Sequence, residues 1–265
     1  AILRCDLSLI ISAYEMDLLI NQFKIDSSLL HHLPFLVDLT ALPSTIKTYE
    51  ERQHFMTIGN FRHAPNWDAV LYLQSIWPLI RQQLPQAELH IYGSYPPPKA
   101  TALNNPKTGF LIKGWAEHAY AVMESARVCL APLRFGAGLK GKLLDAMMVQ
   151  TPSVTTSIGA EGMSMPDMSW PGAIADDGAD FVDAAVRLYG DKETWQTAQN
   201  RTLPHLQQQF DGQKIAKQLI EKINQVQQNL VQHRLDNFTG AMLKHHTMTS
   251  TKYLSQWIME KNKSA

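Results

Sequence analysis

The chain has 265 residues, of which 45% are hydrophobic and 18% are charged, and these proportions are ordinary for a soluble globular protein with an apolar core. Lys and Arg together number 24, as do Asp and Glu, so the formal net charge is zero. Attraction to nucleic acid or to an anionic membrane through bulk charge requires a basic surplus, and we expect neither partner on that ground. The sequence shows no signal peptide and no apolar run near the ~20 residues of a membrane span.

The first predicted elements are a strand at Leu7–Ile11 and a helix at Ala13–Phe23. A linker follows at 31–35, where Pro34 interrupts the pattern, and it marks the first predicted domain boundary. Because the chain opens on Ala1-Ile2-Leu3 without a Met, we expect it to be a segment of a longer protein with a domain before it.

Short apolar runs then alternate with helical patterns, which is typical of a parallel sheet flanked by helices, an α/β Rossmann-like fold. The helical patterns cover 66–84, 117–126, 139–149 and 178–189. In the first of these helices we expect Asn66 to be the N-cap and Pro78 to kink or end the helix. The predicted strands are His54–Ile58, Glu88–Tyr92, Phe110–Ile112, Val128–Ala131, Ser153–Thr156 and Ala173–Ala175.

The last part of the chain is predicted to be helical, at 191–210 and 212–231. The composition changes at His233, and the tail 232–265 is predicted to be a partly helical extension.

Two kinds of residue that could bind a metal or form a disulfide are predicted to do neither. Cys5 and Cys129 lie in separate apolar, strand-like runs, so we expect buried free thiols, which weakly favours a cytoplasmic location. The adjacent pairs His31-His32 and His245-His246 point to different faces of a helix or strand and lack carboxylate partners at suitable spacing.

Ligands of open parallel sheets bind outside the carboxyl ends of the strands, so the loops that follow the predicted strands contain the candidate binding residues. Glycine after a strand lets backbone approach a ligand closely, although a plain strand-to-helix turn explains a single glycine equally well. Trp115 could line a base pocket or simply pack. The candidates from the first three loops are Gly59, Asn60, Phe61, His63, Gly93, Gly114 and Trp115.

The fourth loop, Pro132–Lys142, is more specific. It combines three glycines with three cations at the start of a predicted helix, which supplies backbone N–H groups, a positive helix end and mobile charges around one point. Diphosphate is the ligand this combination favours, and Asp145 in the helix could accept hydrogen bonds from a ribose. The spacing is not that of a Walker loop. The candidates here are Arg134, Gly136, Ala137, Gly138, Leu139, Lys140, Lys142 and Asp145.

The run Pro132–Asp145, followed by Thr155-Thr156 and Gly159–Gly162, resembles the C-terminal half of glycosyltransferase family 4. The resemblance implies one half of a GT-B fold and a retaining, metal-independent transferase whose only small-molecule requirement is a nucleotide-diphosphate sugar. It implies that Arg134 and one or both of Lys140 and Lys142 clamp the diphosphate and that Glu161 is a candidate contact of the sugar.

The same resemblance implies a domain organisation. Residues 1–38 would be the last strand and helix of an N-terminal domain plus the linker, residues 39–231 the nucleotide-sugar-binding domain, and residues 232–265 a helical tail. The missing N-terminal domain would bind the acceptor, a glycan or lipid-linked glycan, and would supply any peripheral membrane contact.

One departure from the family pattern keeps alternatives open. The family commonly carries two Glu residues eight positions apart in this loop, and here these positions are Ala137 and Asp145. Without the first carboxylate, a non-catalytic nucleotide-sugar-binding or partner-binding module, or another GT-B activity such as an epimerase, also fits. A phosphorylase would need a lysine for pyridoxal phosphate, and nothing marks one.

Overall fold

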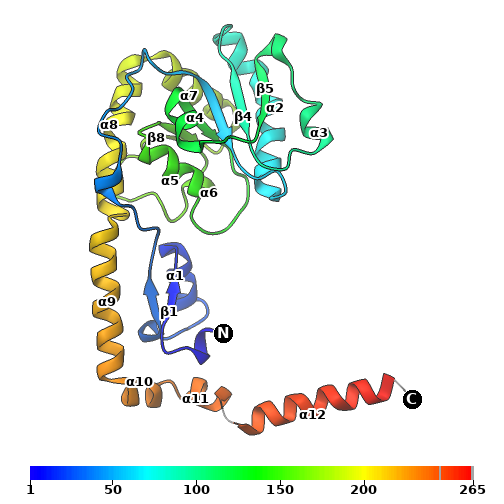
Figure 1. Cartoon of the computed structure of the whole chain (residues 1–265), viewed down its shortest axis with the longest axis vertical. Coiled ribbons are helices and arrows are strands. Elements are labelled where there is room, and N and C mark those ends of the chain that lie inside the picture. The colour runs from blue at the N-terminus through cyan, green and yellow to red at the C-terminus, as the bar shows by residue number, and fades with distance from the viewer. Residues whose placement is uncertain (245, 264–265) are drawn as a thin grey trace. The chain divides into compact units, whose positions relative to one another are not determined.

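The computed structural model describes residues 1–244 and 246–263, with no side-chain description for 246–249, so His245 of the pair His245-His246 lies outside the described residues. The chain divides into two compact units (Figure 1). One is Phe35–Gly212, and the other combines Ala1–Pro34 with the segment that begins at Gln213. Each unit is described separately.

The larger unit contains a six-stranded parallel sheet flanked by helices, as predicted. Each predicted strand corresponds to an observed one to within two residues at either end. The strands are β3 (Gln53–Ile58), β4 (Leu89–Tyr92), β5 (Phe110–Gly114), β6 (Ala126–Ala131), β7 (Ser153–Thr155) and β8 (Gly172–Ile174).

The strand order is β5-β4-β3-β6-β7-β8. The chain starts at β3 in the middle, adds β4 and β5 on one side, and then returns to add β6, β7 and β8 on the other. The loops that follow β3 and β6 therefore leave the sheet in opposite directions and open a crevice between them. Such a topological switch point is where open α/β sheets bind ligands.

Helices cover both faces of this sheet, because successive side chains of each strand point to opposite faces. On one face Phe55, Leu89 and Val128 form a core with residues of α2 (Ala64–Gln83) and α7 (Gly178–Gly190). On the other face Met56 and Cys129 pack against α4 (Ala119–Ser125) and α5 (Gly141–Met148). The unit also contains α3 (Pro98–Thr101), α6 (Ser157–Ala160), α8 (Lys192–Gln209), η3 (Leu39–Ala41) and η4 (Pro106–Thr108).

The N-cap prediction for α2 was wrong, and of the two outcomes predicted for Pro78, a kink or an end of the helix, the end is excluded. The helix begins at Ala64 after an N-cap at His63, because Pro65 sits in the first turn, where its missing N–H costs nothing. Asn66 therefore lies inside the helix and does not cap it. The helix also runs through Pro78 to Gln83 without ending. Buried neighbours such as Trp77 hold that segment on the sheet.

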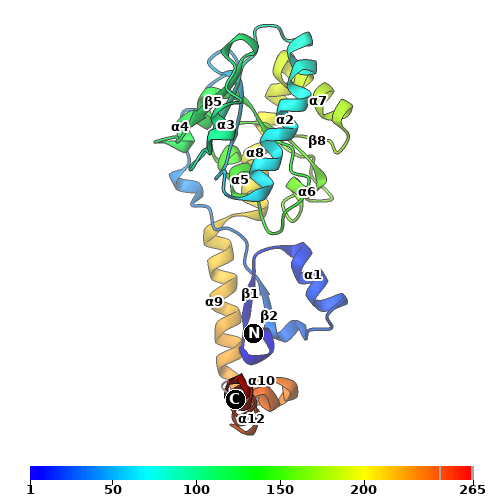
Figure 2. The same cartoon turned by 90° about the vertical axis from the view of Figure 1, so that its right-hand side faces the viewer.

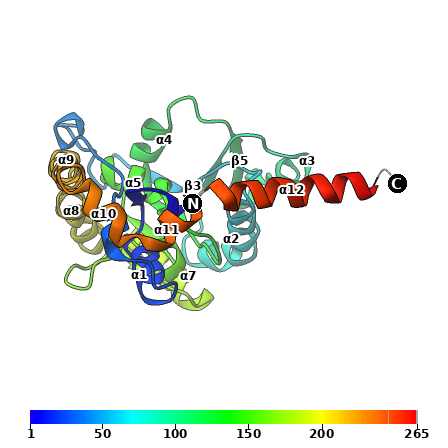
Figure 3. The same cartoon turned by 90° about the horizontal axis from the view of Figure 1, so that it is seen from below.

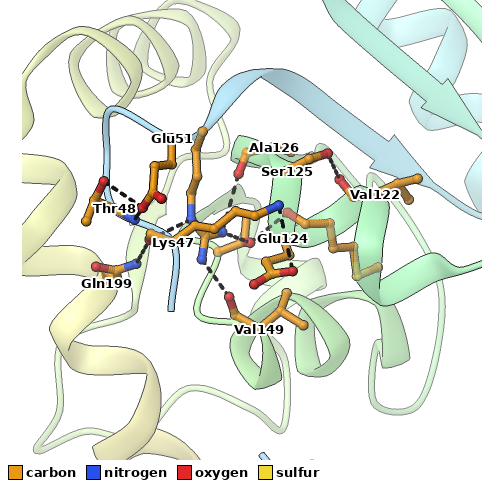
Figure 4. A network of polar contacts seen from close by, with 12 residues as sticks. Lys47, Thr48, Glu51, Val122, Glu124, Ser125, Ala126, Val149 and Gln199 are labelled. Carbon is orange, nitrogen blue, oxygen red and sulfur yellow. Dashed lines mark hydrogen bonds and ion pairs between the residues drawn. The ribbon is translucent and has the colours of Figure 1, made fainter. Parts of the chain in front are cut away.

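A buried arginine ties together the amino-terminal edge of the sheet. Arg52 directly precedes β3 and is fully buried. Its guanidinium donates hydrogen bonds to the carbonyl oxygens of Lys47, Ala126 and Val149 and to the hydroxyl of Thr151. Figure 4 labels Lys47, Ala126 and Val149 in this network of polar contacts. Burial lowers the pKa of Arg52 to about 10, so the side chain is charged at neutral pH. The network links the starts of β3 and β6 to the end of α5.

The second unit contains a two-stranded parallel sheet of β1 (Ser8–Ile10) and β2 (Leu30–His32). The strand β2 lies in the stretch that the sequence predicted as linker. Only three residues pair there, too few for an alternating pattern to show. Figures 2 and 3 show the helices, of which α9 and α12 are the longest in this unit. Its other elements are η1 (Ile2–Arg4), α1 (Ala13–Asn21), η2 (Ser27–Leu29), α9 (Gly212–Gln228), α10 (Leu230–Asp236), α11 (Phe238–Lys244) and α12 (His246–Lys263).

The unit boundaries differ from the predicted boundaries at 38 and 231. Val37 belongs to the larger unit, because its N–H donates to the carbonyl of Phe210 and its carbonyl accepts from Gly212. The helix α9 belongs with the amino-terminal segment, to which Asn237 is also tied through a 3.0 Å hydrogen bond to the carbonyl of Leu3. The extension from 232 is helical in its described residues, as predicted.

Cys5 follows η1 and is exposed, so the prediction of a buried strand residue was wrong there. Cys129 is buried with a free thiol, as predicted. Among the described residues no helix combines the length and apolarity needed to cross a membrane.

Candidate nucleotide-binding site

A cavity of about 370 Å³ lies at the carboxyl edge of the six-stranded sheet, where the loops after β3 and β6 diverge. The first turn of α2, the start of α4 and the first turns of α5 form its other walls. The residues around it are Ile58, Gly59, His63, Pro65, Asn66, Ala119, Met123, Leu133, Phe135, Gly136, Ala137, Leu139, Lys140, Gly141, Lys142 and Asp145.

The cavity brings together half of the residues predicted from sequence. The predicted residues that line it are Gly59, His63, Gly136, Ala137, Leu139, Lys140, Lys142 and Asp145. The predicted residues outside its lining are Asn60, Phe61, Gly93, Gly114, Trp115, Arg134, Gly138 and Glu161.

Glycines in the first two loops allow close packing of the loops themselves. A Cβ on Gly93 would lie 2.0 Å from the carbonyl oxygen of Gly59, and a Cβ on Gly59 would lie 2.5 Å from Cγ of Asn66. Phe61 is in the core at 6% exposure. Asn60 accepts a 2.8 Å hydrogen bond from the N–H of Arg62 and shapes the turn. These residues support the cavity wall, and only Gly59 reaches the cavity.

The glycine loop before α5 has the backbone freedom that its sequence predicts. Gly136 and Gly138 have φ values of +139° and +69°, which favour glycine. A Cβ at Gly138 or Gly141 would meet no atom within 4 Å, so the space beside this loop is open. The positive end of α5 faces the cavity, because Lys140, Gly141 and Lys142 at its start line it.

Lys142 is the cation placed most directly for a bound anion. Its ammonium donates a 2.8 Å hydrogen bond to Oδ1 of Asn66, and it forms no ion pair with a carboxylate in the described part of the chain. Burial lowers the pKa of Lys142 to about 8. A bound anion would offset the free-energy cost of burying the charged ammonium and so favour the protonated form of Lys142. The neighbouring Lys140 donates to the carbonyl of Gly138.

Arg134 points to α2 instead of the cavity. Its guanidinium makes a bidentate pair with Asp68, at 2.9 and 2.5 Å, and lies over the ring of Tyr72, 5.2 Å from the centroid. In this arrangement Arg134 fastens the start of the glycine loop to α2. A direct contact between Arg134 and a diphosphate stays a prediction that requires this pair to open.

Asp145 lies one turn after Lys142 on α5 and also lines the cavity, and burial raises the pKa of its carboxyl group. The hydroxyl of Tyr120 donates to it at 3.3 Å. Sequence analysis missed Tyr120 because nothing in its local pattern distinguishes it, and only packing of α4 beside α5 brings the two side chains together. A half-buried carboxylate that accepts a hydrogen bond from Tyr120 can accept further hydrogen bonds from the hydroxyls of a ribose.

The remaining predicted residues lie at the same edge of the sheet but away from the cavity. Gly114 ends β5, and Trp115 after it is 73% exposed. Glu161 follows α6, which starts directly after β7. Among the described residues no cluster of three or more His, Cys, Asp or Glu side chains could hold a metal ion.

A parallel sheet that is extended in both directions from its central strand, with a cavity bordered by glycines and lysines at its switch point, defines the class of doubly wound α/β domains. Residues 52–191 match the family model described as glycosyl transferases group 1, and the chain belongs to this family. No match was found among curated protein sequences.

Solved structures of similar fold agree with this assignment. S. aureus TarM in complex with UDP has a TM-score of 0.69 at 14% identity, over 83% of this chain and 44% of that one. The pneumococcal O-GlcNAc transferase GtfA with UDP and GlcNAc has a TM-score of 0.62 at 12% identity, over 83% and 45%. Anabaena HepE with UDP and glucose has a TM-score of 0.63 at 13% identity, over 83% and 63%. The chain thus spans less than two thirds of each matched structure.

Proposed function

We propose that this chain provides the donor site of a retaining glycosyltransferase, which moves a sugar from a nucleoside diphosphate to a glycan or lipid-linked glycan. The observation that carries the proposal is the cavity at the switch point, where Lys140, Lys142 and the start of α5 line an open space with Asp145 one turn further along that helix. These groups match the charges of a nucleoside diphosphate. The diphosphate would lie on the lysines and the ribose on Asp145.

In this proposal the lysines contribute to catalysis by electrostatics. Negative charge develops on the diphosphate as the bond from its oxygen to the sugar breaks, and Lys140, Lys142 and the helix end stabilise it. The acceptor hydroxyl attacks from the face that the diphosphate leaves, and a phosphate oxygen takes its proton. The cations then supply the charge stabilisation that a metal ion would otherwise give, so we propose that no metal is needed.

Two further parts of the proposal concern what surrounds the donor. Ala137 lines the cavity and cannot contact the sugar with a carboxylate, so we propose that Glu161 contacts the sugar after the loop adjusts. A domain preceding this chain would hold the acceptor. The matched structures, which are longer than this chain, support that division.

The proposal is tested by titration calorimetry of UDP and GDP, since UDP is present in the TarM and GtfA structures. We expect one nucleotide to bind, with affinity reduced at least ~100-fold in the double variant Lys140→Ala, Lys142→Ala, because two charge-assisted contacts are lost. Lys107→Ala, which removes an exposed lysine away from the cavity, should leave affinity unchanged. Equal affinity in the double variant and the wild type would contradict the diphosphate assignment.

A further inference from the structure

Asn66 connects three elements at the base of the cavity. It lies in the first turn of α2. Its amide oxygen accepts a 2.8 Å hydrogen bond from the ammonium of Lys142 in α5, and its amide nitrogen donates a 3.1 Å hydrogen bond to the carbonyl oxygen of Asn60 in the loop after β3. Both ends of the amide are therefore used, and the oxygen is the end that faces the lysine.

The position of this amide is fixed by packing as well as by hydrogen bonds. The Cα of Gly59 lies so close that a Cβ there would be 2.5 to 2.7 Å from the three terminal atoms of Asn66. A larger side chain at position 66 would displace the loop that contains Gly59. A carboxylate has nearly the same shape as the amide, so aspartate would fit the space and differ mainly in charge.

The neutrality of Asn66 matters because the other groups around Lys142 do not neutralise its ammonium either. The thiol of Cys129 on β6 is neutral, since burial raises its pKa to about 12. Asp145, one turn further along α5, accepts from Tyr120. The other titratable groups around the cavity are the side chains of His63 and Lys140. The amide oxygen thus orients the ammonium without neutralising it.

We propose that Asn66 is a positioning residue of the donor site, which aims the Lys142 ammonium at the diphosphate through a neutral oxygen and so leaves its positive charge for the ligand. This inference rests on the proposed function. The proposed role of Asn66 depends on its lack of charge. A purely structural role would depend only on its shape and hydrogen bonds.

The test is a titration of the full chain with UDP and GDP between pH 7.5 and 9.5, for wild type, Asn66→Asp, Asn66→Ala and a control. In Asn66→Asp an ion pair forms with Lys142, and we expect affinity at pH 7.5 to fall about tenfold or more, as for the loss of one charge-assisted contact. As the pH is raised, the affinity of this variant should begin to decline at a pH at least one unit higher than in wild type, because the carboxylate keeps Lys142 protonated.

The control is Asn104→Asp, which adds the same charge at an exposed site where Oδ1 accepts from the N–H of Ile112 and where aspartate keeps that bond. Its affinity should equal that of wild type. If Asn66→Asp does not fold, Asn66→Ala decides, with an expected loss of about fivefold from misorientation of the ammonium.

Three results would overturn the inference. They are wild-type affinity in Asn66→Asp, an unchanged pH profile in that variant, and wild-type affinity in Asn66→Ala. A wild-type protein that binds neither nucleotide would overturn the proposed function as well, and this outcome is distinguishable because it precedes any comparison of variants.

Discussion

Arg52 and Lys142 are two basic side chains held in opposite ways at opposite edges of the same sheet. Arg52, at the amino-terminal edge, is fully buried and donates to three carbonyl oxygens and a hydroxyl. Lys142, at the carboxyl edge, donates a hydrogen bond to the amide oxygen of Asn66 and borders an open cavity. Neither forms an ion pair with a carboxylate in the described part of the chain.

The difference teaches how a cation's hydrogen bonds distinguish a structural role from a binding role. A buried guanidinium with four of its five N–H donors matched by fixed oxygen atoms has little left for a ligand. An ammonium with donors to spare, beside a cavity, gains free energy when an anion arrives. Burial costs free energy for both cations, but the hydrogen bonds of Arg52 should offset that cost and contribute to the stability of the fold, whereas Lys142 should reduce it.

The largest effect should follow from removing the arginine. We expect Arg52→Met to reduce the free energy of unfolding by about 3 kcal/mol or more, because it leaves buried carbonyl groups without donors. Urea unfolding measures this. Arg81→Met, which removes an arginine that donates a hydrogen bond to the carbonyl of Ala87, should cost about 1 kcal/mol or less. Similar losses in the two variants would remove the distinction between Arg52 and an ordinary surface arginine.

A smaller effect of opposite sign should follow from removing the lysine. The folded-state pKa of Lys142, about 8, is below the unfolded value of about 10.4, so its protonation favours the unfolded chain. The resulting loss of folding free energy is fully present below pH 8 and decreases to near zero as the pH rises towards 10.4. The difference of about 2.4 between the two pKa values corresponds to about 3 kcal/mol, and the loss of the hydrogen bond to Asn66 offsets about 1 kcal/mol of it. Lys142→Met should thus be more stable than wild type by about 2 kcal/mol at pH 7, with no gain at pH 10.5.

The measurement is urea unfolding of both proteins at these two pH values. A methionine variant less stable than wild type at pH 7 would show that the lysine's contacts outweigh its desolvation, and the comparison with Arg52 would fail.

The sequence was sufficient for most of the fold. The six central strands could be located because each is a run of apolar residues between turn signals, such as His54–Ile58 before Gly59. The three-residue strand β2 could not, since its pairing with β1 depends on tertiary contacts. The N-cap of α2 was misplaced because Pro65 starts that helix earlier than a polar side chain alone indicates.

The site was predictable in part. Local composition located the glycine loop and its lysines, because their chemistry is contained in one continuous segment. It could not show that Arg134 turns to Asp68, 66 positions away in sequence. Nor could it pair Tyr120 with Asp145 or Asn66 with Lys142, since these contacts exist only once α4, α2 and α5 meet at the switch point.

The measurement that most directly tests the central claim, that Lys142 meets the diphosphate, is proton uptake on UDP or GDP binding. Calorimetry at pH 8.5 in two buffers of different ionisation enthalpy gives the number of protons bound. With a free pKa of about 8, we predict uptake of about 0.8 proton per nucleotide in wild type and none in Lys142→Met at whatever affinity remains. Tight wild-type binding without proton uptake would contradict the account.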